Sequence, residues 1–100
     1  MSNNIIEMKI EDQILFEIKP YITAGDLTGL QELWNGYQHE IEWEHPIAWD
    51  YIFQKSYLHA ALKKQREICT WLDTLFLTFD PMIQIAMRQM FSYARYLLAK

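Results

Sequence analysis

The sequence predicts an all-α fold, a short helical-repeat array of about five helices packed in antiparallel pairs. Three segments share one helical pattern, in which small and large apolar residues lead to a Leu-rich end. These segments are residues 25–34, 64–72 and 89–98. Units of this kind cannot bury their apolar faces alone and must stack on neighbours. We therefore expect one solenoid-like domain over residues 1–100. Solenoid domains usually bind another macromolecule.

The composition indicates a folded chain with a single core. A chain of 100 residues buries only roughly 60–70% of its unfolded surface, which leaves no room for a second domain. The hydrophobic fraction of 51% and the aromatic fraction of 15% are too high for a disordered chain. The net charge of −4 disfavours direct binding to nucleic acid, because phosphate contacts depend on clustered Lys and Arg.

Turn residues and helix breakers divide the chain into five segments. Apolar stripes at helical spacing define the helices, and Gly, Pro and Asp-Pro interrupt them. The stretch between the two helical pairs alternates polar and apolar residues and ends in a proline, a pattern typical of extended chain. In order, the segments are an N-terminal extension over 1–11, a first helical pair over 12–36, an acidic and aromatic loop over 37–46, a second pair over 47–78 and a terminal helix over 80–99.

Local signals predict where the helices begin and end. Asp26 can cap the second helix by accepting a hydrogen bond from a free amide, and Asn35-Gly36 supplies a left-handed stop. Asp80-Pro81 opens the terminal helix as cap and first residue. That helix is too apolar for full exposure, because its polar stripe is narrow and consists of Gln84, Arg88, Ser92 and Arg95. The residues expected to be buried where repeats meet are Leu30, Ile68, Leu72, Ala86 and Leu97.

The repeated segments resemble the ankyrin repeat, in a degenerate form that keeps the second helix better than the first. The family's Gly-His-Leu-Glu-Ile-Val run matches residues 25–30 and 64–69, with the best local match at Glu67-Ile68-Cys69. Two further matches are Ala60-Ala61 to the paired alanines of the family and Asp80-Pro81-Met82 to its Thr-Pro-Leu opening.

The resemblance covers about residues 17–98 and departs from the family in its spacing. The segments begin at residues 25, 64 and 89, so offsets of 39 and then 25 residues replace a uniform period of about 33. His59 lies one position away from the family's histidine when Ala60-Ala61 is aligned. The alternative is a generic helical array or bundle. Compact degenerate ankyrin-like proteins occur in large DNA viruses and intracellular bacteria, so the resemblance implies a role directed at a host or competitor protein.

Cysteine usage and the N-terminal sequence predict a cytoplasmic protein, inside a host cell if the resemblance holds. Cys69 cannot form an internal disulfide, and its place on an apolar helix face indicates buried packing. Residues 1–7 lack both the basic region and the apolar run of a signal peptide. No window reaches the ~18 apolar residues of a membrane span.

The sequence predicts no catalytic, cofactor-binding or metal-binding residues. The densest polar cluster, residues 39–45, contains His and Glu, but its spacing matches no known ligand pattern, and in extended chain the histidines and acids point to opposite faces. No nucleophile elbow or phosphate-binding glycine loop is present, and Cys69 has no motif-spaced base. The Met and aromatic residues of the terminal helix, which could line a ligand groove, are interpreted as core. We therefore expect no enzyme activity and no cofactor.

Binding of another protein is the predicted function, through an adaptor or an inhibitor. One alternative is a small acidic blocker of a nucleic-acid-binding protein, whose complex would weaken strongly with salt. Another is a structural subunit that forms a homo-oligomer through its last helix. Large aromatic residues carry much of the energy of interfaces. The predicted partner-binding residues are Tyr37, Glu40, Glu42, Trp43, Glu44, Trp49, Tyr93 and Tyr96.

Overall fold

The computed structural model describes residues 8–39 and 46–100, and in these ranges it contains six α-helices and no strand. This confirms the predicted all-α fold. None of the helices in these ranges is long and apolar enough to cross a lipid bilayer. The helices are α1 (Ile10–Ala24), α2 (Leu27–Gln38), α3 (Trp49–Leu62), α4 (Arg66–Phe76), α5 (Pro81–Ala86) and α6 (Arg88–Ala99).

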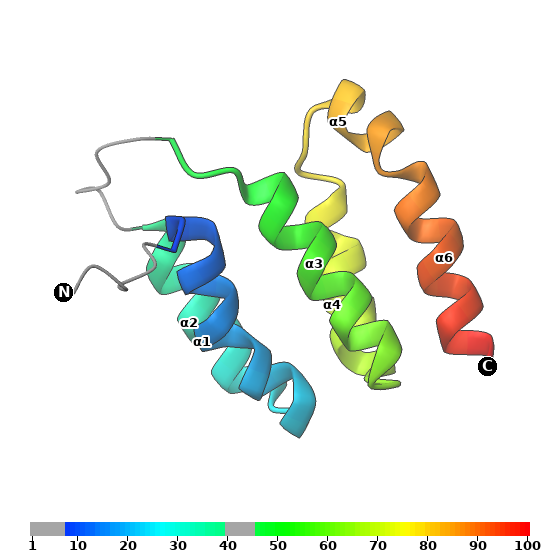
Figure 1. The fold of residues 1–100 in the computed structure, drawn as a ribbon, viewed down its shortest axis with the longest axis horizontal. Coiled ribbons are helices and arrows are strands. Elements are labelled where there is room, and N and C mark those ends of the chain that lie inside the picture. Colours follow the sequence, from blue (N-terminus) through cyan, green and yellow to red (C-terminus); the bar gives the residue numbers. More distant parts are fainter. Residues whose placement is uncertain (1–7, 40–45) are drawn as a thin grey trace, which may run out of the picture.

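Helix α3 lies at the centre of the array. It packs against α1 and α6, and it also contacts its hairpin partner α4. Figure 1 shows that α1, α3 and α6 run in the same direction, whereas α2 and α4 return beside α1 and α3 to form two antiparallel hairpins. The helices therefore form two layers, with α1, α3 and α6 in the first layer and α2 and α4 in the second.

The core fills the space between these layers. Trp34 of α2 is buried, and its ring packs 5.3 Å from that of Trp49 and, edge to face, 5.7 Å from that of Trp71 on α4. These contacts join the two hairpins through their aromatic side chains. Four of the five residues predicted to be buried lie in this core, namely Leu30, Ile68, Leu72 and Leu97.

The start of α2 forms as predicted, but its predicted end is wrong. The Asp26 side chain accepts a hydrogen bond from the Gly29 amide at 2.9 Å. Asn35-Gly36 does not stop the helix, which continues to Gln38, and Gly36 has no positive φ. His39 ends the helix instead, with its Nδ1 2.7 Å from the carbonyl oxygen of Asn35. The helical extension places Tyr37 against the core, and this burial outweighs the local stop signal.

Replacing Gly36 with Ala should raise the free energy of unfolding by about 0.5–1 kcal/mol. Gly36 lies inside α2, and a Cβ atom added there would meet no atom within 4 Å. Alanine therefore restricts the unfolded chain without creating a clash. Urea unfolding followed by circular dichroism measures the change. A loss of stability would show that Gly36 needs the left-handed conformation after all.

The matched control is Gly29→Ala, the same substitution in the same helix. A Cβ atom at Gly29 would lie 2.5 Å from the Asp26 carboxylate and 2.7 Å from the Tyr21 ring. Such contacts require the cap or the ring to move, so this variant should lose stability. The two variants together separate helix propensity from packing.

The two hairpin turns have the same structure, 39 residues apart. Gly25 follows α1 with a φ of 72°, and Lys64 follows α3 with a φ of 60°. The same backbone hydrogen bonds surround both residues. The positive φ suits glycine at the first turn and is unusual for lysine at the second. The offset between the first two repeated segments thus corresponds to two equivalent turns.

The turn between α3 and α4 also binds the ends of the neighbouring helices. The Gln65 side chain donates to the Thr23 carbonyl in the last turn of α1 at 3.1 Å. Two further donors reach the last turn of α6. The Lys64 ammonium donates to the Leu97 carbonyl, and the Arg66 guanidinium donates to the Leu98 carbonyl at 2.8 Å. The last carbonyls of a helix lack partners within the helix and carry partial negative charge, so such donors stabilise them.

The predicted terminal helix is interrupted at Met87, where α5 ends and α6 begins. Asp80 and Pro81 open α5 as predicted, with the Asp80 carboxylate accepting from the Met82 amide at 2.9 Å. The prediction that Ala86 is buried is wrong, because the bend turns Ala86 to the surface and buries Met87 completely. A single helical period does not continue across a change of axis.

The third repeated segment does not occupy a position equivalent to the first two. Residues 25–34 and 64–72 lie mainly in α2 and α4, whereas 89–98 lie in α6, which belongs to the layer of α1 and α3. The likeness of this segment to the other two comes from its apolar spacing and not from an equivalent place in the fold.

Candidate protein-interaction surfaces

Two of the predicted partner-binding residues, Tyr93 and Tyr96, form an exposed face on α6. Their side chains are 55% and 58% exposed, and their rings stack at 6.3 Å with an angle of 19° between the planes. The Lys100 ammonium lies 5.6 Å from the centre of the Tyr96 ring. The same helix turns Met90 and Ala94 into the core, so the tyrosines occupy sides of α6 that point away from α3. We call Tyr93 and Tyr96 the tyrosine face.

The other predicted aromatic residues of the described chain are partly buried. Tyr37 packs against the core from the last turn of α2, and burial followed by a hydrogen bond to Glu17 raises the pKa of its hydroxyl to about 12. Trp49 begins α3 and stacks on Trp34, so its ring contributes to the core rather than standing free in a loop. Neither residue joins the tyrosine face. The remaining predicted residues, Glu40, Glu42, Trp43 and Glu44, lie outside the described residues.

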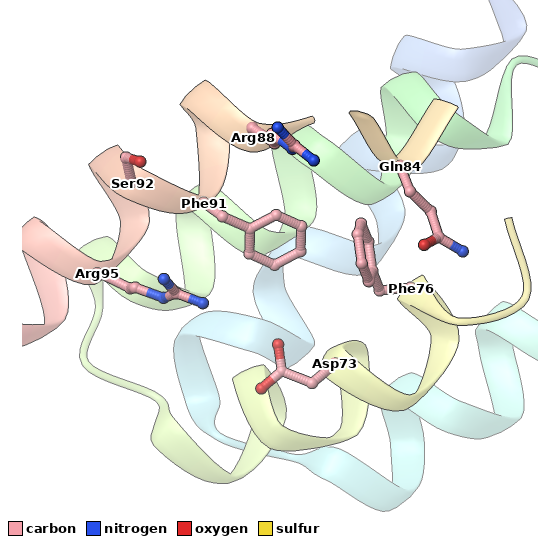
Figure 2. Close-up of a pocket in the computed structure, with 7 residues that line it drawn as sticks. All are labelled: Asp73, Phe76, Gln84, Arg88, Phe91, Ser92 and Arg95. Carbon is pink, nitrogen blue, oxygen red and sulfur yellow. The ribbon is translucent and has the colours of Figure 1, made fainter. Parts of the chain in front are cut away.

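A groove between α4 and α5–α6 forms a second surface, which the sequence did not predict as a site. Its main chamber has a volume of about 450 Å³, and a smaller one of about 320 Å³ continues it toward Pro81 and Ile85. Figure 2 shows the side chains of the main chamber, with the two phenylalanine rings at its centre and the polar groups around them. The lining residues are Asp73, Phe76, Gln84, Arg88, Phe91, Ser92 and Arg95. We call this the arginine groove.

The floor of the arginine groove is aromatic. The rings of Phe76 and Phe91 meet edge to face at 4.7 Å, and Tyr57 lies 4.9 Å from Phe91. The Tyr57 hydroxyl donates a hydrogen bond to the Asp73 carboxylate at 2.7 Å. Burial and this bond raise the pKa of Tyr57 well above its usual value, so the hydroxyl stays protonated and holds Asp73 in place.

One signal of the groove was visible in the sequence. The narrow polar stripe of the predicted terminal helix supplies four of the lining residues, three of them from α6 itself. The opposite wall, Asp73 and Phe76, comes from α4, and only the packing of the helices brings it to face this stripe. Sequence spacing within one helix cannot reveal that juxtaposition.

The remaining reactive side chains are poor candidates for chemistry. Cys69 is buried, and burial raises the pKa of its thiol to about 11, so the nucleophilic thiolate is scarce at neutral pH. His59 Nε2 lies 2.8 Å from the Thr23 hydroxyl, and burial, followed by the charges of Lys19 and Lys63, lowers the pKa of His59. No group of three or more His, Cys, Asp or Glu side chains in residues 8–39 and 46–100 is arranged to hold a metal ion.

Comparison with known proteins gives no relative from which a function could be transferred. No family model matches the chain, and neither the curated proteins nor the solved structures contain a match. The resemblance of the repeated segments to ankyrin therefore stays a prediction from the sequence, and the function must be argued from the surfaces of the molecule.

Proposed function

We propose that this chain is a protein-interaction module that binds through the tyrosine face of α6. The observation that supports it is the pair of stacked, more than half-exposed rings of Tyr93 and Tyr96. Tyrosine is enriched among the residues that dominate the energy of protein interfaces, because its large ring is rigid and its hydroxyl can form a hydrogen bond. An exposed pair costs little entropy to order, since the stacked rings restrict each other.

The position of α6 in the array supports the same proposal. Helix α3 is covered on two sides, by α1 and by α6, whereas α6 packs mainly against α3 and touches α4 through Phe91 and Phe76, which leaves Tyr93 and Tyr96 exposed. In stacked helical arrays, the face of one unit is the surface that receives the next. The tyrosine face is therefore suited to a second protein or to a second copy of this chain.

A double variant, Tyr93→Glu with Tyr96→Glu, tests the proposal. We expect wild-type protein to self-associate in sedimentation velocity or to retain a partner in affinity capture from its native source. The double variant should weaken that association by about 30-fold or more, because a charged side chain at a desolvated tyrosine position loses the contact and adds a desolvation cost.

Phe16→Glu is the matched control, because Phe16 is 74% exposed but lies on α1 at the other side of the array. It makes the same kind of change, a glutamate in place of an exposed aromatic ring, at one position, and it should leave association unchanged. Circular dichroism establishes that all variants are folded. A wild-type monomer at high concentration, with the same captured proteins for wild type and double variant, would remove the tyrosine face from the interface.

A further inference from the structure

We infer that the arginine groove is a docking site for an acidic amphipathic helix of a partner protein, distinct from the tyrosine face. Arg88 and Arg95 would hold two carboxylates of that helix, and an apolar side chain between them would cover Phe76 and Phe91. Charge, spacing, the aromatic floor and the layer arrangement each support this occupant.

The two arginines carry charge that the described part of the chain does not neutralise. Neither the Arg88 nor the Arg95 side chain forms an ion pair or hydrogen bond with residues 8–39 or 46–100, although the charge of Arg95 acts on the nearby Tyr57 hydroxyl. Both guanidinium groups border the groove (Figure 2). A guanidinium presents a planar set of donors that matches the geometry of a carboxylate. The groove is thus locally basic although the whole chain has a net charge of −4.

The spacing of the arginines favours a helix over a small anion. Arg95 follows Arg88 by seven positions on α6, which corresponds to about two turns and roughly 10 Å along the axis. Figure 2 shows the two guanidinium groups on different sides of the Phe91 ring, an arrangement that suits two separate carboxylates better than one small anion. A helix lying along α6 can place two acidic residues two turns apart, at positions i and i+7, opposite the two arginines.

The aromatic floor lies between these two charges. Phe76 and Phe91 line the main chamber together with both arginines, and Ile85, which is 53% exposed, extends the apolar surface at the α5 end. A Leu or Met at position i+3 or i+4 of the docked helix would face this floor. Burial of that side chain supplies affinity, and the flanking ion pairs set the register.

The layers of the fold leave a place for such a helix. Helix α2 lies beside α1 and α4 beside α3, but no helix of the described residues lies beside α6 in the second layer (Figure 1). The arginine groove occupies this position, with α4 as one wall and α6 as the other. A docked helix there would continue the second layer.

Asp73 makes the groove selective. Its carboxylate stands on the α4 wall, held by Tyr57, and it would repel an acidic residue placed on that side. The docked helix should therefore carry its acids on the edge that faces α6 and a neutral or basic residue on the edge that faces α4. This requirement excludes uniformly acidic peptides.

Two synthetic peptides of about 14 residues, long enough for roughly four helical turns, serve as probes. Both are Ala-based with a central Leu, and they carry either two Glu or two Lys residues at i and i+7. Fluorescence anisotropy measures binding to the wild-type protein. We expect the Glu peptide to bind and the Lys peptide to bind at least about 10-fold more weakly, a difference that shrinks at high salt.

Charge reversal supplies the decisive test. The variant Arg88→Glu with Arg95→Glu should lose binding of the Glu peptide by about 10-fold or more and gain binding of the Lys peptide. The matched control is Lys9→Glu with Lys19→Glu, which changes the net charge equally at exposed positions near α1 and should leave both affinities unchanged. The Tyr93→Glu, Tyr96→Glu variant should also bind the Glu peptide normally.

Three results would overturn the inference. The first is the absence of Glu-peptide binding up to about 1 mM, the weak limit of specific association. The second is equal loss of binding in both charge-reversal variants, which would indicate a general effect of net charge. The third is loss of binding only in the tyrosine variant, which would place the peptide on the tyrosine face and leave the proposed function intact.

Discussion

Replacing Leu72 with Ala should lower the free energy of unfolding by about 2–5 kcal/mol. Leu72 is completely buried on α4, in the core that joins the two layers. Truncation removes apolar surface and leaves a cavity that the close-packed surroundings fill only in part. Because small domains are stable by only about 5–15 kcal/mol, the loss is a large share of the total. Urea unfolding, followed by far-ultraviolet circular dichroism, measures the change.

Leu77→Ala is the control for this experiment. Leu77 follows α4 directly and is 74% exposed. The same chemical truncation at this position should change stability by less than about 0.5 kcal/mol. If Leu72→Ala unfolds at the same urea concentration as the wild type, α4 does not pack as described.

Replacing Phe53 with Ala should have an equal or larger effect, about 3–5 kcal/mol. Phe53 of α3 is completely buried, and its ring packs against four others, which come from α3 itself, α4, the loop after α4 and α6. The nearest are Phe79, with its centre 5.2 Å away and nearly edge to face, and Tyr57 at 5.9 Å. Phe91 of α6 and Phe76 of α4 complete the cluster at 6.2 Å and 6.4 Å.

The effect of Phe53→Ala should also be regional, because this cluster supports the floor of the arginine groove. Hydrogen exchange should rise most in α3, α4 and α6, which carry rings of the cluster, and less in α2, which contributes none. Phe16→Ala, at a 74% exposed position on α1, is the control and should leave stability nearly unchanged. Exchange that rises equally in all helices would show that the cluster has no special role in docking α6.

The hairpins were predictable because their determinants are local. Gly25 permits the left-handed turn, and Asp26 caps α2 from the next position along the chain. The end of α2 was mispredicted because a tertiary effect outweighed a local one. Extending the helix past Gly36 buries part of Tyr37 and brings both the amide and the ring of His39 to the Asn35 carbonyl, and neither gain can be seen from Asn35-Gly36 alone.

The two candidate surfaces also differ in whether local sequence or tertiary packing determines them. The tyrosine face was predictable from the apolar excess of one helix, and the structure places both rings at the surface. Trp49 was predicted as a partner-binding residue, and in the structure α3 begins at this residue and directs its ring onto Trp34. The arginine groove was not predictable, because its two walls come from helices whose relative placement depends on the packing of α3.

The side-chain bonds of the α3–α4 turn have a consequence for cooperativity. The stability of a stacked array is the sum of what each unit contributes and what each interface contributes, and weak interfaces allow end units to fray independently. The central α3–α4 turn forms hydrogen bonds with the ends of both α1 and α6, the two outer helices of the first layer. The donors are the side chains of Lys64, Gln65 and Arg66. Loss of these bonds therefore weakens the attachment of α1 and of α6 together, which favours melting as a single unit over the stepwise loss of one hairpin at a time.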